Sequence, residues 1–230
     1  MPNDPLQAAP ISLNRTAIAD RVFDELQRQI LSLDLKPGTK MSEADVAKAF
    51  GISRQPVRQV FFRLSRMGFL DVRPQVASRI SFISENAVLQ ARFIRCALES
   101  KAIKVACEKL SEEDLDYFSD HIETQRKAVQ DHDSDLFHTL DEDFHKEIYN
   151  RSGVGFAWDL IKEHKAHMDR VRYRSLPLNL DNAFQAHVRI LEALKNRDKS
   201  EASRQMDQHL SEIFELLKNV REEFPDFFVE

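Results

Sequence analysis

The chain has 230 residues, 42% of them hydrophobic, which is enough to bury a core in one large or two smaller domains. Five glycines and eight prolines argue against a loop-rich or β-rich protein and favour long helices. The net charge of −5 is unevenly divided, because residues 1–80 hold 12 Lys and Arg against 8 Asp and Glu, a charge of +4, which leaves −9 for the remainder. This asymmetry predicts an N-terminal domain that binds nucleic acid and a second domain with another task.

The segment of residues 1–14 contains three prolines and no hydrophobic pattern, which predicts a mobile N-terminal arm. It has neither the basic start nor the apolar core of a signal peptide. No segment of the chain reaches transmembrane length without charges, so we expect a cytoplasmic protein. An amphipathic helix is predicted from Thr16 to about Leu33.

Residues 40–70 predict two short helices around a tight turn. Ser42 is expected to cap the first helix, Gly51 to form the turn and Ser53 to open the second helix. Gly68 should end the second helix, whose inward positions are Val57, Val60, Phe61 and Leu64.

The free face of this second helix is basic, and no acidic residue occurs between Asp45 and Asp71. Such a helix suits the DNA major groove, where Arg can bind guanine and Gln can read adenine. The alternative is a solvated basic helix on an ordinary helical protein. We expect base readers and phosphate contacts as follows: Arg54, Gln55 and Arg58 for bases, Ser53, Arg63 and Arg66 for phosphates, and Ser42 as a further DNA-binding residue.

The run MSEADVAKAFGISRQPVRQVFFRLSRMGFL resembles the winged helix-turn-helix domain of GntR-family bacterial transcription regulators, most specifically from Gly51 to Arg58. The resemblance covers about residues 15–80 and implies a DNA-binding domain over residues 15–83, with wing strands at 69–72 and 78–83. This chain has Ala77 where the family's wing normally carries glycine, and a Cβ there makes the tip less free to approach a DNA backbone.

The chain after Ser84 has a helical pattern throughout, which predicts an all-α antiparallel bundle of about six helices over residues 84–230. The inward face of the first helix is expected to include Leu89, Phe93 and Ala102, and the aromatic tail at 224–228 to dock on the bundle or on a partner subunit. A loop is expected at 176–179. The six predicted helices span residues 85–109, 111–130, 133–149, 156–173, 181–195 and 199–220.

Four polar residues lie on the apolar flanks of three of these helices. Asp141 and His145 are four residues apart and share a face, while His187 and His209 stand among apolar residues of two later helices. One carboxylate and three imidazoles can converge on a divalent metal ion such as Zn²⁺, or alternatively Ni²⁺ or Mn²⁺. A lone histidine on an apolar face is, however, more often a satisfied core residue.

The segments LDEDFH, AHVRILEAL and MDQHL, which contain these residues, resemble three signature segments of the FCD ligand-binding domain found in the FadR subfamily of GntR regulators. The resemblance covers about residues 85–222 and implies that the metal ligands are Asp141, His145, His187 and His209. A bundle of six helices rather than seven resembles the VanR-like branch of the subfamily.

Arg95 and Glu99 match the family's Arg-x-x-Leu-Glu at the start of the effector domain. Two interpretations stay open, because Arg95 can bind the carboxylate of an effector bidentately or form a surface ion pair with Glu99. Arg170, Arg172 and Arg174 can also face an anionic ligand, but we assign them to a solvated face.

These observations predict a homodimeric transcription regulator, usually a repressor, whose affinity for double-stranded operator DNA is controlled by a small organic acid bound beside a divalent metal. The alternative is a metal-dependent enzyme of helical-bundle type, because Glu142 and His145 have the Glu-x-x-His spacing of di-iron bundles. No second Glu-x-x-His follows, and an enzyme would leave the basic helix unexplained, so we expect no enzymatic activity.

Overall fold

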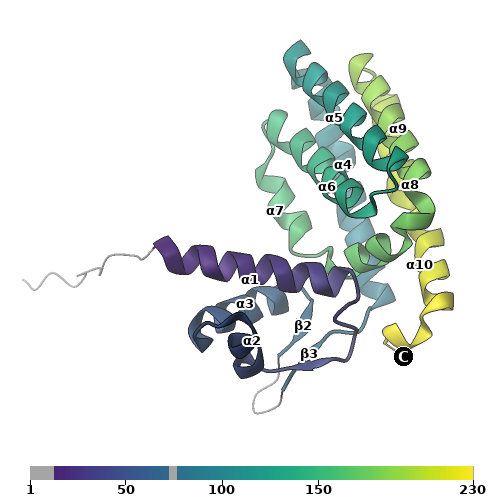
Figure 1. The fold of residues 1–230 in the computed structure, drawn as a ribbon. Coiled ribbons are helices and arrows are strands. Elements are labelled where there is room, and N and C mark those ends of the chain that lie inside the picture. Colours follow the sequence, from purple (N-terminus) through teal and green to yellow (C-terminus); the bar gives the residue numbers. More distant parts are fainter. Residues whose placement is uncertain (1–12, 73–76, 230) are drawn as a thin grey trace, which may run out of the picture.

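The computed structural model describes residues 13–72 and 77–229, which form a small N-terminal part and a helical bundle (Figure 1). The predicted arm lies outside the described residues except for 13 and 14, at which the first helix begins. Four residues of the predicted wing, 73–76, also lie outside them. None of the described helices combines the length and the apolar character needed to cross a bilayer.

The N-terminal part is a winged helix-turn-helix. Ser42 caps α2 as predicted, because its hydroxyl accepts a hydrogen bond from the backbone N–H of Asp45. Gly51 and Gly68 follow α2 and α3 with φ angles of 65° and 82°, which glycine adopts without a steric penalty. The antiparallel sheet has the order β1-β3-β2. Its elements are α1 (Leu13–Leu31), β1 (Lys40–Met41), α2 (Glu43–Phe50), α3 (Arg54–Arg66), β2 (Leu70–Asp71) and β3 (Ser78–Ile80).

A single hydrophobic cluster joins α1, α2, α3 and the sheet. It includes all four predicted inward residues of α3, which are buried. It also includes Ala166 from the start of the bundle helix α8, so the two parts of the molecule share a core where they meet. In Figure 1, α1 lies across the base of the bundle.

The bundle contains seven α-helices within the described residues, where about six were expected. The first three agree with the predicted spans to within two residues at each end. The helices are α4 (Glu85–Lys109), α5 (Glu112–Gln130), α6 (Ser134–Arg151), α7 (Phe156–Lys162), α8 (Ala166–Lys195), α9 (Lys199–Ser211) and α10 (Ile213–Glu223), followed by the short 3₁₀ helix η1 (Pro225–Phe227).

The prediction of a loop at 176–179 was wrong, because α8 continues through Pro177. Leu176 and Leu180 are four residues apart and both buried, so packing on one face of the helix outweighs the proline penalty of roughly 3 kcal/mol. The chain instead breaks earlier, between α7 and α8, and again at Glu212, which separates α9 from α10.

The predicted inward face of α4 was wrong at Leu89 and Phe93, although Ala102 is buried as expected. Leu89 and Phe93 are 41% and 73% exposed, whereas Arg95 and Glu99 are only 1% exposed. A hydrophobic pattern alone cannot reveal this, because α4 has apolar residues around most of its circumference. The inner face of α4 is polar where it meets the centre of the bundle.

The junction between the two parts is held by polar contacts. Arg170, fully buried on α8, donates hydrogen bonds to the Ser81 carbonyl oxygen (2.5 Å) and to Nδ1 of His167 (2.7 Å). Arg170 is therefore not part of a solvated face, and burial lowers its pKa to about 10. The aromatic tail docks within the same chain, because the Ile83 N–H donates to the Phe227 carbonyl (2.8 Å).

Candidate functional site

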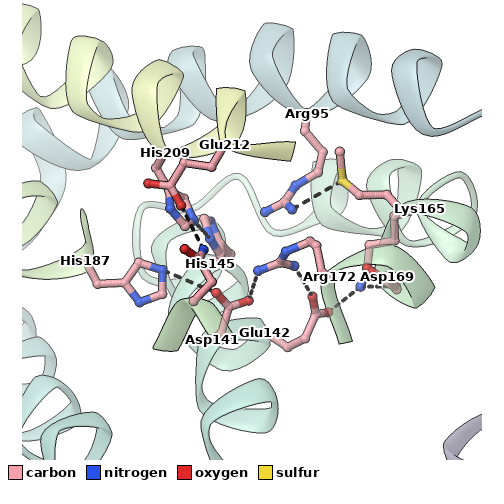
Figure 2. Close-up of polar contacts among 12 residues, drawn as sticks. Arg95, Asp141, Glu142, His145, Lys165, Asp169, Arg172, His187, His209 and Glu212 are labelled. Atoms are coloured by element: carbon pink, nitrogen blue, oxygen red, sulfur yellow. Dashed lines mark hydrogen bonds and ion pairs between the residues drawn. The ribbon is translucent and has the colours of Figure 1, made fainter. Parts of the chain in front are cut away.

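Asp141, His145, His187 and His209 meet at the centre of the bundle (Figure 2). Asp141 and His145 lie one turn apart on α6, His187 lies on α8 and His209 on α9. One carboxylate oxygen or imidazole nitrogen from each residue lies within 4.8 Å of the others, and all four residues are buried. The structure thus brings together the four residues that the sequence singled out.

The ligand atoms approach one another in two pairs. His187 Nε2 lies 3.4 Å from Asp141 Oδ1, and His145 Nε2 lies 3.2 Å from His209 Nε2. Phe144 stacks on the His187 ring, with ring centroids 4.3 Å apart, and so fixes the plane of that imidazole. Two imidazole nitrogens as close as those of His145 and His209 must either share one proton or bind the same cation.

Two outer residues orient the histidine rings. Glu99 on α4 lies 2.6 Å from His145 Nδ1, and the Gln125 side-chain oxygen on α5 lies 2.9 Å from His187 Nδ1. We assign the proton to Nδ1 in both rings, because a carboxylate or amide oxygen can only accept there. The Nε2 lone pairs of both rings are then free to face the centre, which is how metal-binding histidines are commonly held.

The electrostatics favour neutral histidines beside an ionised carboxylate. Burial lowers the pKa of His187 to about 3 and holds that of His209 well below its usual range. Burial alone would raise the pKa of Asp141, but the positive charge of Arg172 and the three neighbouring imidazoles together hold that pKa well below the ordinary value. Neutral imidazoles and a carboxylate are the forms that bind a metal ion.

A cation would supply partners that these residues lack. Within the described part of the chain, Asp141 Oδ1 and His187 Nε2 are buried without a hydrogen-bond partner, and both face the centre of the cluster. Unpaired buried polar atoms are costly, and one oxygen with three nitrogens is a donor set that suits several divalent ions. The cluster is therefore compatible with metal binding.

A chain of ion pairs extends from Asp141 to the other side of α6 (Figure 2). Arg172 on α8 pairs with Asp141 and with Glu142. Lys165 continues the chain, because its Nζ lies 2.5 Å from Glu142 and 2.7 Å from Asp169. The assignment of Arg172 to a solvated face was wrong, because its side chain is only 13% exposed, and no local pattern in α8 reveals this inward position.

Arg95 lines a small cavity beside the cluster, together with Arg172, His209 and Glu212. Arg95 Nε donates to Glu99 (2.5 Å), so the ion pair expected as an alternative does form, but it is buried rather than on the surface. Arg95 Nη2 is buried and has no partner among the described residues. One side of the guanidinium is thus held by Glu99 while another donor remains available.

The predicted DNA-binding residues lie on or beside α3. Arg54, Gln55 and Arg58 are exposed on the side away from the core, and Arg58 makes only a 3.4 Å contact with Glu43. Ser53 is exposed at the start of α3, and its hydroxyl makes no capping bond. These four side chains are accessible to a ligand at the N-terminal end of the helix.

Other predicted DNA contacts have partners within the protein. Ser42 is engaged as the cap of α2. Arg63 pairs with Asp20 of α1 at 2.6 Å. Arg66 pairs with Glu163 of the bundle at 2.8 Å. These ion pairs are exposed and therefore weak, so a phosphate could compete with them.

The helix-turn-helix, joined to a helical bundle with a buried polar centre, defines the class of DNA-binding transcription regulators. Residues 18–80 match the family of bacterial regulatory proteins called the gntR family, and residues 90–212 match the FCD domain. The chain therefore belongs to the GntR family and carries an FCD domain, which confirms the resemblance found in the sequence.

The chain is similar to known regulators over most of its length. The HTH-type transcriptional repressor RspR of Escherichia coli strain K12 is 34% identical over 215 residues, 93% of this chain and 94% of that protein. The probable D-xylose utilization operon transcriptional repressor of Paenarthrobacter nicotinovorans is 26% identical over 212 residues, 90% of this chain and 91% of that protein. These relatives are regulators, which confirms the expectation that this protein is not an enzyme.

A solved structure supports the fold. Escherichia coli McbR/YncC superimposes with a TM-score of 0.76 at 23% sequence identity, and the match covers 91% of this chain and 99% of that one. Its arrangement of a winged helix-turn-helix and a helical domain is thus shared by this chain.

Replacing Arg172 should destabilise the fold, because the carboxylates of Asp141 and Glu142 lose a positively charged partner. In chelator-treated protein, Arg172→Met leaves Asp141 without its cation and should lower the free energy of unfolding by about 3–5 kcal/mol. The control Arg204→Met removes an exposed pair with Glu201 and should leave the free energy of unfolding nearly unchanged. Urea denaturation measures both, and equal losses would contradict the assignment of Arg172 to the buried network.

Proposed function

We propose that this regulator holds a divalent metal ion in its bundle and that a small organic acid bound beside the ion controls its affinity for operator DNA. The observation that supports the proposal most directly is the buried cluster of Asp141, His145, His187 and His209, with Arg95 next to it. The relatives named as repressors favour a repressor that is released by its ligand.

The four residues of the cluster would hold the ion, with Glu99 and Gln125 fixing two of the imidazole rings. Zn²⁺ suits three imidazoles and a carboxylate, and Ni²⁺ and Mn²⁺ remain alternatives because this mixed set of nitrogen and oxygen donors suits several ions. The ion would supply a positive centre on which the carboxylate of the acid binds.

The effector would enter the cavity beside the cluster. Arg95 offers a free Nη2 there, and Arg172 adds a second positive charge. Two guanidinium groups and a metal ion together select an anion, and Leu176, Ile213 and Leu216 limit the rest of the ligand to a small apolar body. The chemical class that fits is a small carboxylic acid.

Binding of the acid would change the shape of the bundle near α8. The cavity measures about 30 Å³, which is space for roughly two water molecules, so an organic acid must widen it. α8 lines the cavity through Arg172 and Ser175 and contacts the N-terminal part through Arg170 and Ser81. A displacement of α8 would therefore shift the helix-turn-helix and change operator affinity.

We propose residues 15–83 as the DNA-binding domain and 84–230 as the effector domain. Arg54, Gln55 and Arg58 would read bases, since they are exposed at the N-terminal end of α3. Ser53 would contact a phosphate, and the remaining phosphate contacts would require Ser42, Arg63 and Arg66 to exchange their present partners.

The functional unit proposed is a homodimer on a pseudo-palindromic operator. Leu89 and Phe93 on α4 and Phe214 on α10 are exposed at 41%, 73% and 46%. Leu89 and Phe214 line one surface groove, and the Arg92 guanidinium lies 4.5 Å from the Phe214 ring centre. An apolar surface of this kind is typical of subunit contacts, and two subunits would present two α3 helices to the two half-sites.

The coupling can be tested by operator binding in the presence of Zn²⁺ and a panel of small carboxylic acids. At least one acid should weaken binding, and Arg95→Lys should need about 10- to 100-fold more of that acid, because lysine keeps the charge beside Glu99 but loses the second donor. Arg126→Lys, in an exposed pair with Glu123, serves as the control. A panel without any effect, with metal bound, would contradict the coupling.

Arg58→Ala should weaken binding to the selected operator by about 1–3 kcal/mol and relax the preference at one base pair per half-site. The reason is the loss of a bidentate contact with a base. Fluorescence anisotropy with operator variants measures both effects, and Arg204→Ala on α9 is the matched control. Unchanged binding by Arg58→Ala would show that α3 is not the reading helix.

A further inference from the structure

Phe62 on α3 is an exposed aromatic residue in an unexpected place. Its side chain is 65% exposed, although its neighbours Val60, Phe61 and Leu64 are buried in the N-terminal core. Neither the described aromatic pairs nor the described cation–π contacts include it. A single exposed phenylalanine is common on protein surfaces, so the case for a partner of Phe62 depends on its position on α3.

Phe62 lies on the side of α3 that points away from the core. At about 100° per residue, the four buried positions of α3 centre on one side, and Gln55 and Phe62 fall nearly opposite to it. Arg58 and Gln59 flank them and are also exposed. The four exposed residues follow the spacing i, i+3, i+4 and i+7.

The same spacing is used by a known recognition helix. The homeodomain reads the major groove with four residues at i, i+3, i+4 and i+7 of its third helix. Gln59, which the sequence analysis did not select, and Phe62 would complete such a row after Gln55 and Arg58. Phe62 thus belongs to the surface that faces the bases when α3 lies in the groove.

The surroundings of Phe62 restrict the kind of partner. Arg58 and Arg66 lie one turn before and one turn after it, and no acidic residue occurs between Asp45 and Asp71. The acids that pair with these two arginines, Glu43 and Glu163, come from outside α3, and both ion pairs are exposed and therefore weak. A second copy of this basic surface would repel it, whereas DNA would attract it. The C5-methyl group of thymine is the apolar group that base edges present in the major groove.

We propose that Phe62 contacts a thymine methyl group and so specifies a T·A pair in each half-site, next to the pairs read by Gln55, Arg58 and Gln59. The inference rests on the proposed reading role of α3. It adds an apolar specificity contact that neither the basic character of the helix nor its match to the family assigns.

Deoxyuridine substitution isolates this contact, because deoxyuridine pairs like thymidine but lacks the methyl group. The operator is first selected from random duplexes with the full-length wild-type protein, and each thymine is then replaced singly. Wild type should lose about fourfold in affinity at one thymine per half-site, the factor for one buried methyl group. Phe62→Ala should bind the thymine and deoxyuridine operators equally. Phe156→Ala, at a 75% exposed phenylalanine on α7, should keep the wild-type ratio.

Two outcomes would overturn the inference alone: a wild type that is indifferent to every replacement although Arg58→Ala binds poorly, or a Phe62→Ala variant with the wild-type ratio. A Phe62→Ala variant that changes oligomeric state and keeps the ratio would instead place Phe62 in a subunit contact. A wild type that selects no operator would overturn the reading role of α3 as a whole, and this inference with it.

Discussion

The bundle is organised by the need to bury a carboxylate and three imidazoles at its centre. An isolated buried charge is costly, so Arg172 neutralises Asp141 from one side, while Glu99 and Gln125 hold two histidine rings from others. These three partners come from α8, α4 and α5, and the residues that they hold come from α6 and α8, so these helices must be in register for the contacts to form. The same requirement turns the polar side of α4 inward and leaves Phe93 at the surface, where a second subunit could cover it.

The long helix α8 connects this centre to the DNA-binding part. It carries His187 towards one end and Arg172 near the cavity, and its first turns place Arg170 against Ser81 and Ala166 in the N-terminal core. One continuous helix transmits a displacement better than two helices joined by a loop. The passage of α8 through Pro177 would therefore matter for the proposed regulation as well as for the fold.

Structural features that depend on residue types at short spacing can be predicted from the sequence, whereas features that depend on packing between helices cannot. The caps and glycine turns around α2 and α3, and the four buried positions of α3, follow from residue types at fixed spacing. Convergence of Asp141 with three distant histidines could be proposed only because each lies on an apolar flank and the segments resemble a family. Gln125 gives no such signal, since a polar residue on a helix is usually solvated. Glu99 matches a family motif, but the motif does not reveal its contact with His145. Pro177 and the inner side of α4 depend on tertiary contacts that outweigh local preference.

The central claim is that the four convergent residues bind a metal ion, and metal content tests it most directly. Protein purified without chelator is analysed by elemental mass spectrometry beside His187→Ala and beside His164→Ala, which removes an exposed histidine outside the cluster. We expect about one divalent ion per chain in the wild type and in His164→Ala, and a loss of the ion in His187→Ala. A folded, DNA-binding wild type that contains no metal, even after incubation with Zn²⁺, would contradict metal binding. The histidines would then form a pocket held by hydrogen bonds alone.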